Sequence, residues 1–514
     1  MDSDTSSKPR RVVQAREILD KIERGEDVEY DRVIVEGDLD ISGLELRTEH
    51  MDRTGFELIF GLSNVLKVVC SQIKIANSEI KGEVKLSNVH VQKPINFSRG
   101  EFTAGKADFR GAKFARANFR EAKFTAGKTD FMGAEFGGDI VDFGRAEFAG
   151  DADFNGAKSW DAYFRGAKFG GLADFERTRF RHADFWNAKF RCGANFSQAK
   201  FEFAEFGESD FDDDAEFSYS DFGSAWFREE SEFCFVNFNG AKFTRKAHFR
   251  KAKFDGETNF RDAKFNGETN FRRAWFKGAT DFNGVKFSGD VDFDRAKFND
   301  DATFWEAKFD QKLKLDGSKY ERLYITWNSI EDNLVYSGPV YLALIKNFKI
   351  IEQFDDADDC YYIYRRKSQA RKKWFSKKRF NWSKLLDWIG FVSCGYGVRI
   401  WPIIIWVLVS VFGFMFLYKL MPQSYGGIAE SGPSTVTMEA MNNSTLLFTF
   451  GAGDGVISPS WGDCLYFSFT ALTGGTPDGL HPVGLVKYAV MVESVLGYLF
   501  LALFVVVLAR KIIR

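Results

Sequence analysis

The residue whose chemistry stands out first is Glu493, a carboxyl group inside the apolar segment 483–510. Lys487 is the other charged side chain of that segment before Arg510. An ionisable group in such a segment is costly to bury, so it is a functional candidate by default. Two roles are open for Glu493: its carboxyl group faces a cavity, or it hydrogen-bonds to the back of a neighbouring helix.

Residue types that support catalysis are scattered along the chain. None of the six cysteines forms a C-x-x-C pair or lies near a histidine at metal-binding spacing. The sequence offers no nucleophile with a base and no phosphate-binding loop. We therefore expect no enzyme, no metal site and no cofactor, and the net charge of −2 gives no reason to expect a nucleic-acid partner. The histidines that form no constellation are His50, His90, His182, His248 and His481.

Two apolar segments, 400–420 and 483–510, are each long enough to span a bilayer. Lys and Arg crowd the sequence before the first segment, and KIIR follows the second. The positive-inside rule thus predicts that both flanks are cytoplasmic and that residues 421–482 face outward. Within this outer part, DCLYFSFTAL (463–472) is too short to span and predicts a re-entrant helix. Asp463 stands at its start, where a carboxylate suits a helix N-terminus.

The next residues are TGGTPD (473–478). A span, a re-entrant helix, this sequence and a second span form a layout that resembles the two-transmembrane potassium-channel superfamily over residues 400–514. The family filter reads T-V-G-Y-G-D. The resemblance implies that Asp463 and Thr470 belong to a pore helix, that 473–478 form a selectivity filter, and that Gly497 is the hinge of an inner helix. The residues at matching positions are Thr470, Thr473, Gly475, Asp478, Pro482 and Gly497.

This filter departs from the family at Gly474, Thr476 and Pro477, where the family has Val, Tyr and Gly. Gly474 and Gly475 can adopt the alternating backbone that points carbonyl groups inward, whereas Pro477 has a fixed φ. We expect the inner part of the filter to survive and the outer part to be altered. The expected permeant ions are monovalent cations, K⁺ and/or Na⁺, with weakened potassium selectivity. Asp478 either forms a ring of carboxylates at the outer mouth or braces the filter through hydrogen bonds.

Helical spacing predicts which side chains of the second span face the pathway. Glu493 lies one turn before Gly497, on the same predicted stripe. Leu501 and Val505 are expected to close the pathway by dewetting, with Gly497 as the bend; the alternative is that they only pack against the outer helix. The predicted lining residues are Tyr498, Leu501, Val505 and Ala509.

The sequence from Phe97 to Phe309 repeats a unit similar to A-D-F-x-x-A-K-F, as in ADFRGAKFARANFREAKF (107–124). Phe occurs 57 times in the chain, and in the repeat its spacing alternates between five and six residues, which fits neither a helix nor a simple strand. Each unit is expected to turn a corner and to insert Phe toward an axis that stacked coils share. The repeat resembles the pentapeptide-repeat family, whose fold is a right-handed quadrilateral β-helix. The six-residue steps imply a bulge at alternate corners.

The remaining segments complete the predicted organisation. The basic run RKKWFSKKR (371–379) precedes the amphipathic KLLDWIGF (384–391), which predicts a helix at the cytoplasmic membrane surface; a solvated linker is the alternative. The predicted domains are a helical cap (1–30), a degenerate start of the β-helix (31–96), the β-helix itself (97–310), a helical linker with the amphipathic segment (311–399) and a two-transmembrane pore domain (400–514).

The sequence therefore predicts a multidomain protein, with an all-β solenoid and an all-α transmembrane module. We expect a homotetrameric cation channel in the plasma membrane, multi-pass, embedded in the lipid bilayer, with both termini cytoplasmic. The solenoid is expected to be a regulatory domain or to bind a cytoplasmic protein partner. The alternative is a membrane-anchored scaffold that does not conduct and that presents its solenoids to such a partner.

Overall fold

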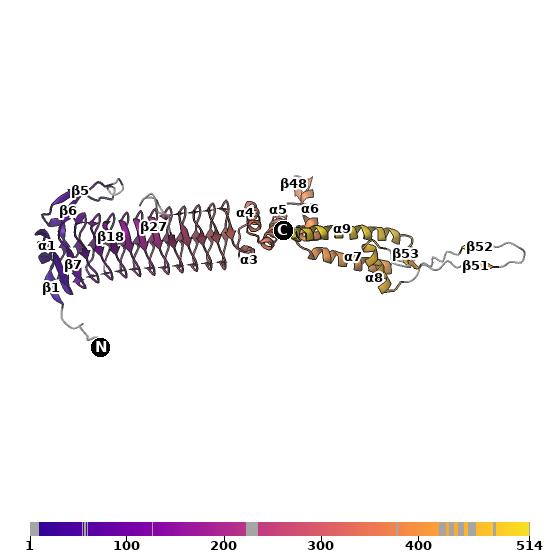
Figure 1. Ribbon diagram of the computed structural model, residues 1–514, viewed down its shortest axis with the longest axis horizontal. Coiled ribbons are helices and arrows are strands. Elements are labelled where there is room, and N and C mark those ends of the chain that lie inside the picture. The colour runs from indigo at the N-terminus through magenta and orange to yellow at the C-terminus, as the bar shows by residue number, and fades with distance from the viewer. Residues whose placement is uncertain are drawn as a thin grey trace, which may run out of the picture. The chain divides into compact units, whose positions relative to one another are not determined.

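The computed structural model divides into two compact units, Met1–Asp356 and Ala357–Arg514, and each is described by itself. The predicted β-helix followed by a helical region with two apolar helices is confirmed (Figure 1). The residues that the structure describes are 10–53, 55, 58, 60–125, 127–222, 235–376, 379–420, 428–430, 436–439, 447–450, 459–475 and 480–512.

The first unit is a parallel β-solenoid whose coils each add one strand to a 13-stranded sheet. A 12-stranded sheet runs from β4 (Leu39–Asp40) to β45 (Leu313–Lys314), and a 22-stranded sheet contains the other strands of the solenoid. The strands of the 13-stranded sheet are β1 (Arg11–Gln14), β3 (Val33–Glu36), β8 (Glu79–Ile80), β12 (Glu101–Phe102), β16 (Lys123–Phe124), β19 (Glu147–Phe148), β22 (Lys168–Phe169), β25 (Lys189–Phe190), β28 (Asp210–Phe211), β32 (Lys242–Phe243), β36 (Lys264–Phe265), β40 (Lys286–Phe287) and β44 (Lys308–Phe309).

Columns of phenylalanine fill the interior of the solenoid. The strand register places Phe169, Phe190 and Phe211 on successive coils. Their rings stack, with centroids 4.8 Å apart in the first pair and 4.7 Å apart in the second. Small residues such as Ala167 and Ala188 are buried beside them. Each coil therefore covers the apolar face of the next, which a single coil could not bury alone.

The five-residue steps of the repeat turn tight corners. The carbonyl group of Phe271 accepts a hydrogen bond from the amide of Ala274 at 2.9 Å, and Arg273 has a φ of 60°, as in a type II turn. The side chain of Asn270 accepts a hydrogen bond from the amide of Arg272 at 2.9 Å. Short polar side chains that bind their own backbone favour turns, which explains why Asp or Asn precedes so many of the phenylalanines.

The segment predicted as a helical cap, residues 1–30, contains strands as well as a helix. Helix α1 (Ala15–Glu23) lies between two strands of the solenoid. Strand β1 pairs in parallel with β3, and β2 (Val28–Asp31) pairs in parallel with β7 (Ile73–Ala76). The two β-branched valines of RVVQ and the alternating apolar residues of VEYD favour strands, and the predicted cap had merged them with the helix. The residues of α1 that are buried are Ala15, Ile18, Leu19 and Ile22.

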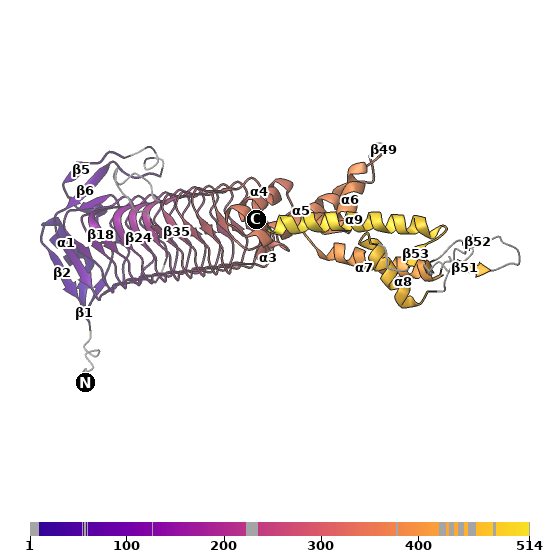
Figure 2. The same ribbon diagram turned by 45° about the vertical axis from the view of Figure 1, so that its right-hand side comes forward.

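The solenoid also continues past the predicted boundary at residue 310. Strands β46 (Lys319–Tyr320) and β47 (Leu323–Tyr324) extend it, with Tyr320 in register with Phe298 and Leu323 in register with Ala302. Helices α3 (Trp327–Ile330) and α4 (Gly338–Ile350) follow at its end (Figure 2).

A buried side chain of α4 caps the edge of β47. The Asn347 side-chain amide donates to the carbonyl oxygen of Leu323 at 2.7 Å and accepts from the Leu323 amide at 2.9 Å. These are the two hydrogen bonds that a further strand would make there. Strand edges left open pair with other chains, so Asn347 ends the ladder at this residue.

His248 and Glu216 connect two neighbouring coils. Nδ1 of His248 lies 3.1 Å from Oε2 of Glu216, across the pair β29 (Ala215–Glu216) and β33 (Ala247–His248). The hydrogen bond to Glu216 raises the pKa of His248. Burial alone would raise the pKa of Glu216, but hydrogen bonds from His248 and Ser218 hold it below its ordinary value.

We expect this pair to make the stability of the solenoid depend on pH. The raised pKa of His248 stabilises the fold at low pH, and this contribution is lost as pH rises through its pKa in the folded protein. The lowered pKa of Glu216 stabilises the fold at higher pH. This contribution is lost as pH falls through the pKa of Glu216 in the folded protein. Both contributions are therefore present between the ordinary pKa values of 4.5 and 6.5. There His248→Gln should lower the free energy of unfolding by less than about 1 kcal/mol, measured by denaturant titration. A difference independent of pH would contradict this assignment.

The second unit is helical, with short strands. Its elements are α5 (Phe354–Arg371), which begins in the first unit, the hairpin β48 (Phe375–Ser376) and β49 (Arg379–Phe380), α6 (Trp382–Cys394), η2 (Gly395–Gly397), α7 (Trp401–Leu420), β50 (Ile428–Glu430), β51 (Val436–Glu439), β52 (Leu447–Phe450), α8 (Trp461–Leu472), β53 (Leu480–Pro482) and α9 (Val486–Ile512). Helices α7 and α9 are long and apolar enough to cross a membrane.

Candidate functional site

Helix α8 is a short helix packed against the two long apolar helices (Figures 1 and 2). It has 12 residues, so it is too short to cross a bilayer. Two apolar clusters fix it. One cluster contains Met415, Tyr418, Ile428, Cys464, Phe467 and Val486, and the other contains Ile403, Val411, Leu472, Phe500 and Val507.

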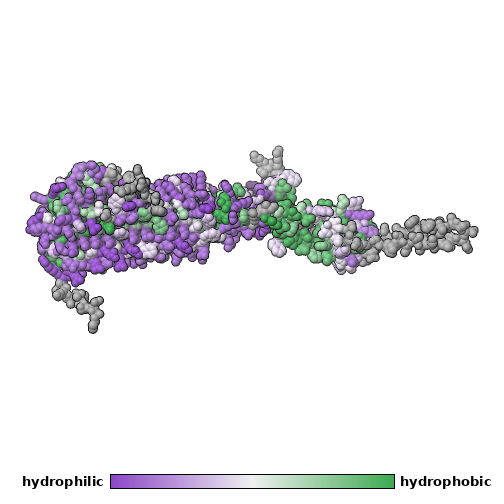
Figure 3. Space-filling view, in the orientation of Figure 1, coloured by the Kyte–Doolittle hydropathy of each residue, from purple (hydrophilic) through white to green (hydrophobic). Residues whose placement is uncertain are grey.

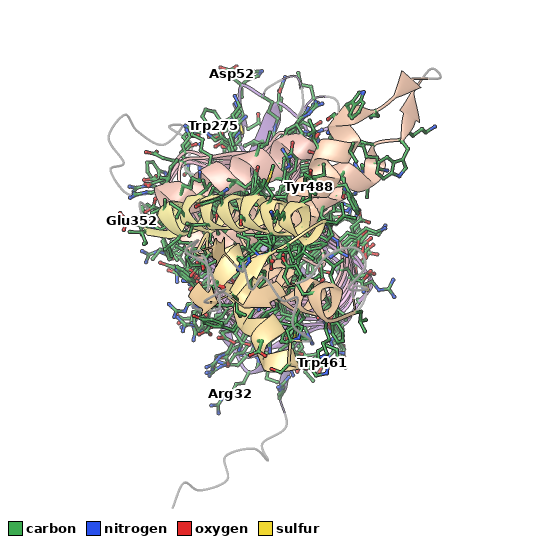
Figure 4. The ribbon with its side chains drawn as sticks, turned by 90° about the vertical axis from the view of Figure 1, so that its right-hand side faces the viewer. Arg32, Asp52, Trp275, Glu352, Trp461 and Tyr488 are labelled. Atoms are coloured by element: carbon green, nitrogen blue, oxygen red, sulfur yellow. The ribbon has the colours of Figure 1, made fainter. Side chains whose placement is uncertain are left out.

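The N-terminus of α8 is closed by a capping box. The Ser460 hydroxyl accepts from the Asp463 amide at 3.2 Å, and the Asp463 carboxylate accepts from the Ser460 amide at 2.8 Å. These hydrogen bonds with Ser460 hold the pKa of Asp463 below its ordinary value. Lys419 donates to the carbonyl oxygen of Pro459 at 2.6 Å, which ties the end of α7 to this cap. Trp461, at the same end of α8, is exposed (Figure 4).

The C-terminus of α8 ends in a Schellman motif. Gly474 has a φ of 77°, its amide donates to the carbonyl oxygen of Ala471 at 3.1 Å, and the Gly475 amide donates to that of Thr470 at 2.8 Å. The Thr473 hydroxyl donates to the carbonyl oxygen of Thr470 at 2.9 Å. Gly474, which was expected to belong to an alternating filter backbone, terminates the helix in a left-handed conformation.

Helix α9 contacts the end of α8 through two small residues and one tyrosine. A Cβ atom at Gly497 would lie 1.8 Å from the carbonyl oxygen of Leu472. Ser494 donates a hydrogen bond to the carbonyl oxygen of Ala471 at 2.9 Å. A Cβ atom at Gly474 would lie 2.5 Å from the hydroxyl oxygen of Tyr498. Gly497 therefore permits a close backbone approach, in addition to any role as a bend.

Glu493 is fully buried between three helices. Tyr418 of α7 donates to its Oε2 at 2.5 Å, and Ser468 of α8 is hydrogen-bonded to its Oε1. The second role considered above, a bond to the back of the neighbouring short helix, describes this position. Glu493 shares the buried face of α9 with Phe500 and Val507.

Glu493 and Gly497 both contact α8, as expected of residues on one stripe of a helix, whereas the predicted lining residues lie on another face of α9. Tyr498, Leu501 and Val505 lie on an exposed face of α9, while Glu493 is buried. Ala509 is half-buried. Tyr498 and Leu501 also line an apolar cavity of about 400 Å³ that reaches α7 and the end of α8. Spacing in sequence gave the relative angles of these residues but not the rotation of α9 about its axis.

Helix α5 is tied to the ends of both long helices. Asp358 pairs with Arg510 of α9 at 3.0 Å, and Asp359 pairs with Arg399, just before α7, at 3.4 Å. The guanidinium group of Arg399 also lies 4.1 Å from the ring centroid of Tyr362. A displacement of α5 would therefore act on the residues that flank both apolar helices.

Helix α6 has no buried residue. Asp387 accepts hydrogen bonds from Arg365 and Lys372, both at 2.6 Å. The exposed apolar side chains of α6 fit the predicted amphipathic surface segment. They are Trp382, Leu386, Trp388 and Ile389.

The surface of the second unit is apolar. Only 22% of the apolar window of α7 and 17% of that of α9 is buried, whereas the core helix of a soluble protein would be mostly buried. Figure 3 shows hydrophobic residues gathered over the helices and mainly hydrophilic residues over the solenoid. Exposed side chains at both ends of α9 include Tyr488 (Figure 4) and Ile512. So large an apolar surface requires lipid or further protein around it.

Some predicted site residues cannot be placed, and some important ones were not predicted. Thr476, Pro477 and Asp478 lie outside the described residues. Tyr418 and Ser468, the partners of Glu493, were not predicted from the sequence. The available signal was a hydroxyl side chain inside each apolar helix, because a buried hydroxyl must find a hydrogen-bond partner.

Comparisons with known proteins identify the repeats alone. A family model described as pentapeptide repeats (9 copies) matches residues 159–200, 238–286 and 271–319. A second, described as pentapeptide repeats (8 copies), matches residues 104–126. Neither model extends to the apolar helices, and no channel family supports the predicted pore. No curated protein matches the chain.

Proposed function

We propose that this chain of pentapeptide repeats is one subunit of a tetrameric membrane channel for monovalent cations. The observation that carries the proposal is α8, a capped 12-residue helix held by buried hydrogen bonds between two helices long enough to cross a membrane. A short helix at membrane depth is tolerated where protein or a water-filled cavity surrounds it. Its presence is difficult to explain in a simple membrane anchor.

The electrostatics of α8 favour a cation at its C-terminal end. The carbonyl groups of the last turn give a helix C-terminus a partial negative charge, and half-helices use such ends to coordinate cations in transporters. Gly474 and Gly475 follow directly and expose backbone without a side chain. Four subunits would bring four such ends together around an axis. Their filters are the proposed ion-selective part, in which Asp478 attracts cations.

The exposed face of α9 supports assembly of several subunits. Tyr498, Leu501 and Val505 are between half and two-thirds exposed in a single subunit. In the proposed tetramer this face lines the pathway below α8, and the other apolar faces contact lipid or neighbouring subunits. Constriction at Leu501 and Val505 would stop ions by excluding water. Both termini are proposed to be cytoplasmic, in the plasma membrane, because basic residues flank the two spans.

The solenoid is proposed as the regulatory arm of this channel and as a surface for a cytoplasmic protein. The ion pairs of α5 with Arg510 and Arg399 support this role, because they connect the linker to both long helices. A force on α5 would reach Arg510, one residue after the predicted lining residue Ala509.

Arg510→Gln should therefore alter gating without altering selectivity. Losing a partly exposed ion pair costs up to about 1 kcal/mol, which corresponds to roughly a 2- to 5-fold change in the ratio of open to closed channels. Single-channel recording measures this ratio. Arg322→Gln, which breaks the solenoid pair with Asp301, is the matched control and should leave it unchanged. Equal effects of both substitutions would argue against coupling through α5.

Flux from liposomes tests the channel itself. The purified protein is reconstituted, and K⁺, Na⁺ and Cl⁻ fluxes are measured under equal gradients. We expect flux of both cations, little flux of chloride, and less preference for potassium than a complete T-V-G-Y-G-D filter gives. Thr473→Val, which keeps the side-chain shape and removes the hydroxyl, should change the cation ratio. Thr103→Val in the solenoid is the control.

The absence of any flux from a protein shown to be tetrameric would contradict the channel proposal. It would favour the membrane-anchored scaffold, in which the filter does not conduct and the helices hold four solenoids together for a cytoplasmic partner. Strong selection for potassium over sodium would leave the channel intact but contradict its altered selectivity.

A further inference from the structure

The buried carboxyl group of Glu493 joins three helices at one point. Its Oε2 accepts from Tyr418 of α7 at 2.5 Å, and its Oε1 is hydrogen-bonded to Ser468 of α8. The same Ser468 oxygen lies 3.0 Å from the carbonyl oxygen of Val411 of α7. Glu493 itself belongs to α9. None of these contacts is used by the conduction pathway proposed above.

The number of protons in this network decides the state of Glu493. A serine hydroxyl has one proton to donate, yet Ser468 lies between two oxygen acceptors, on Glu493 and on Val411. With an ionised Glu493, one of these contacts has no proton. With a proton on Oε1, Glu493 donates to Ser468, Ser468 donates to Val411, and Tyr418 donates to Oε2. Every contact then has one donor and one acceptor.

The surroundings provide no compensating positive charge. Within the part of the chain that the structure describes, no lysine, arginine or histidine is hydrogen-bonded or ion-paired to Glu493. Lys419 is engaged with the carbonyl oxygen of Pro459. A buried ionised carboxylate without a cationic partner is strongly unfavourable. The charged and titratable groups on the elements packed around it are Tyr418 and Lys419 on α7, Asp463, Cys464 and Tyr466 on α8, His481 on β53, and Lys487, Tyr488, Tyr498, Arg510 and Lys511 on α9 itself.

We propose that Glu493 is a proton-binding site whose proton holds α7, α8 and α9 together. Loss of the proton leaves a buried charge, so the arrangement breaks: α8 separates from α9 or water enters between them. Ser494 and Gly497 contact the end of α8 within the next turn of α9. Release of the proton from Glu493 would therefore disturb Gly474 and Gly475 at the end of α8. The site is a proton switch, and its effect on ion flux rests on the proposed channel function.

Infrared spectroscopy tests the proton directly and needs no ion conduction. The full-length protein in lipid is titrated with acid and base, and the carboxylic-acid C=O band is recorded for wild type and for Glu493→Gln. We expect a band at neutral pH in wild type that is missing in the variant and that disappears as pH rises. Ser468→Ala removes the acceptor of the Glu493 proton and should move the band to higher frequency.

The matched control is Glu202→Gln. Glu202 is also buried, but it pairs with Arg181 at 2.8 Å, so its carboxylate should contribute no acid band at neutral pH. If wild type and Glu493→Gln have identical acid bands, Glu493 is ionised and the proposal is wrong.

Thermal unfolding and flux measure what the proton does. The amide side chain introduced by Glu493→Gln can donate to Ser468 and accept from Tyr418, so it imitates the protonated acid. We expect equal melting temperatures at neutral pH. With rising pH, the melting temperature of the helical unit and the flux should fall in wild type but stay constant in Glu493→Gln. The same pH dependence in both proteins would overturn the switch. An acid band with no flux would instead support the proton site and contradict the channel.

Discussion

Gly497→Ala should destabilise the helical unit and reduce cation flux at least about 10-fold. The added Cβ atom would lie 1.8 Å from the carbonyl oxygen of Leu472 and 2.8 Å from its carbonyl carbon. Both neighbours are backbone atoms, so no side chain can rotate away and α8 or α9 must move. Overpacking of this kind costs about 3 kcal/mol at its upper range. Thermal unfolding of the purified protein and liposome flux would measure the two effects.

Gly413→Ala on α7 is the matched control. Nothing lies within 4 Å of a Cβ atom added there. Alanine also favours a helix over glycine by about 1 kcal/mol, so this variant should be as stable as wild type or more stable. A Gly497→Ala protein with unchanged melting temperature and altered gating alone would show that Gly497 acts as a hinge and that α9 does not need close contact with Leu472.

Phe175→Ala should be the most damaging single change in the solenoid, at about 3–5 kcal/mol of unfolding free energy. Its ring is fully buried and stacks on Phe154 at 4.8 Å and on Phe196 at 4.9 Å between centroids. Phe185 packs against its edge at 5.1 Å. Denaturant unfolding would measure the loss, and amide hydrogen exchange should show it concentrated in the adjoining coils, because each coil contacts only its neighbours.

Phe235→Ala provides the comparison within the solenoid. It removes the same side chain from a position that is 38% exposed, so the loss should be below about 1 kcal/mol. Similar losses at Phe175 and Phe235 would mean that the stacked columns contribute little beyond ordinary surface contacts.

The repeat made the solenoid predictable, because Phe recurs at a spacing that only stacked coils accommodate. The ends were less predictable. At β2 the apolar residues alternate as in a strand, and β1 contains two β-branched valines, but the helix between them obscured the pattern. At β46 Tyr320 occupies the position that Phe298 has one coil earlier, and at β47 Leu323 occupies that of Ala302. A search for Phe alone therefore ends one coil too early.

The helical unit was predictable in outline, because α7, α8 and α9 follow from the lengths of apolar segments. Their contacts were not. The position of Glu493 depends on the rotation of α9, which is fixed by Gly497 against Leu472 and by Phe500 in the buried cluster. The sequence shows that residue 497 is glycine and that residue 493 is glutamate. It does not show that Gly497 contacts Leu472 or that Glu493 contacts Tyr418 and Ser468.

The register of the solenoid has a consequence for how such arms can vary. Successive strands of the 13-stranded sheet are offset by 21 or 22 residues over most of its length, as in the contacts of Lys168 with Glu147 and of Arg99 with Glu121. An insertion or deletion of one whole coil would restore every side chain to its column. Another number of residues keeps the columns only where a connection between strands takes up the difference, as between Asp210 and Lys242, which are paired although 32 residues apart. Each whole coil that is added or removed therefore changes the length of the solenoid by about 4.8 Å. Its length can be changed one step at a time without altering either the α1 end or the Asn347 end.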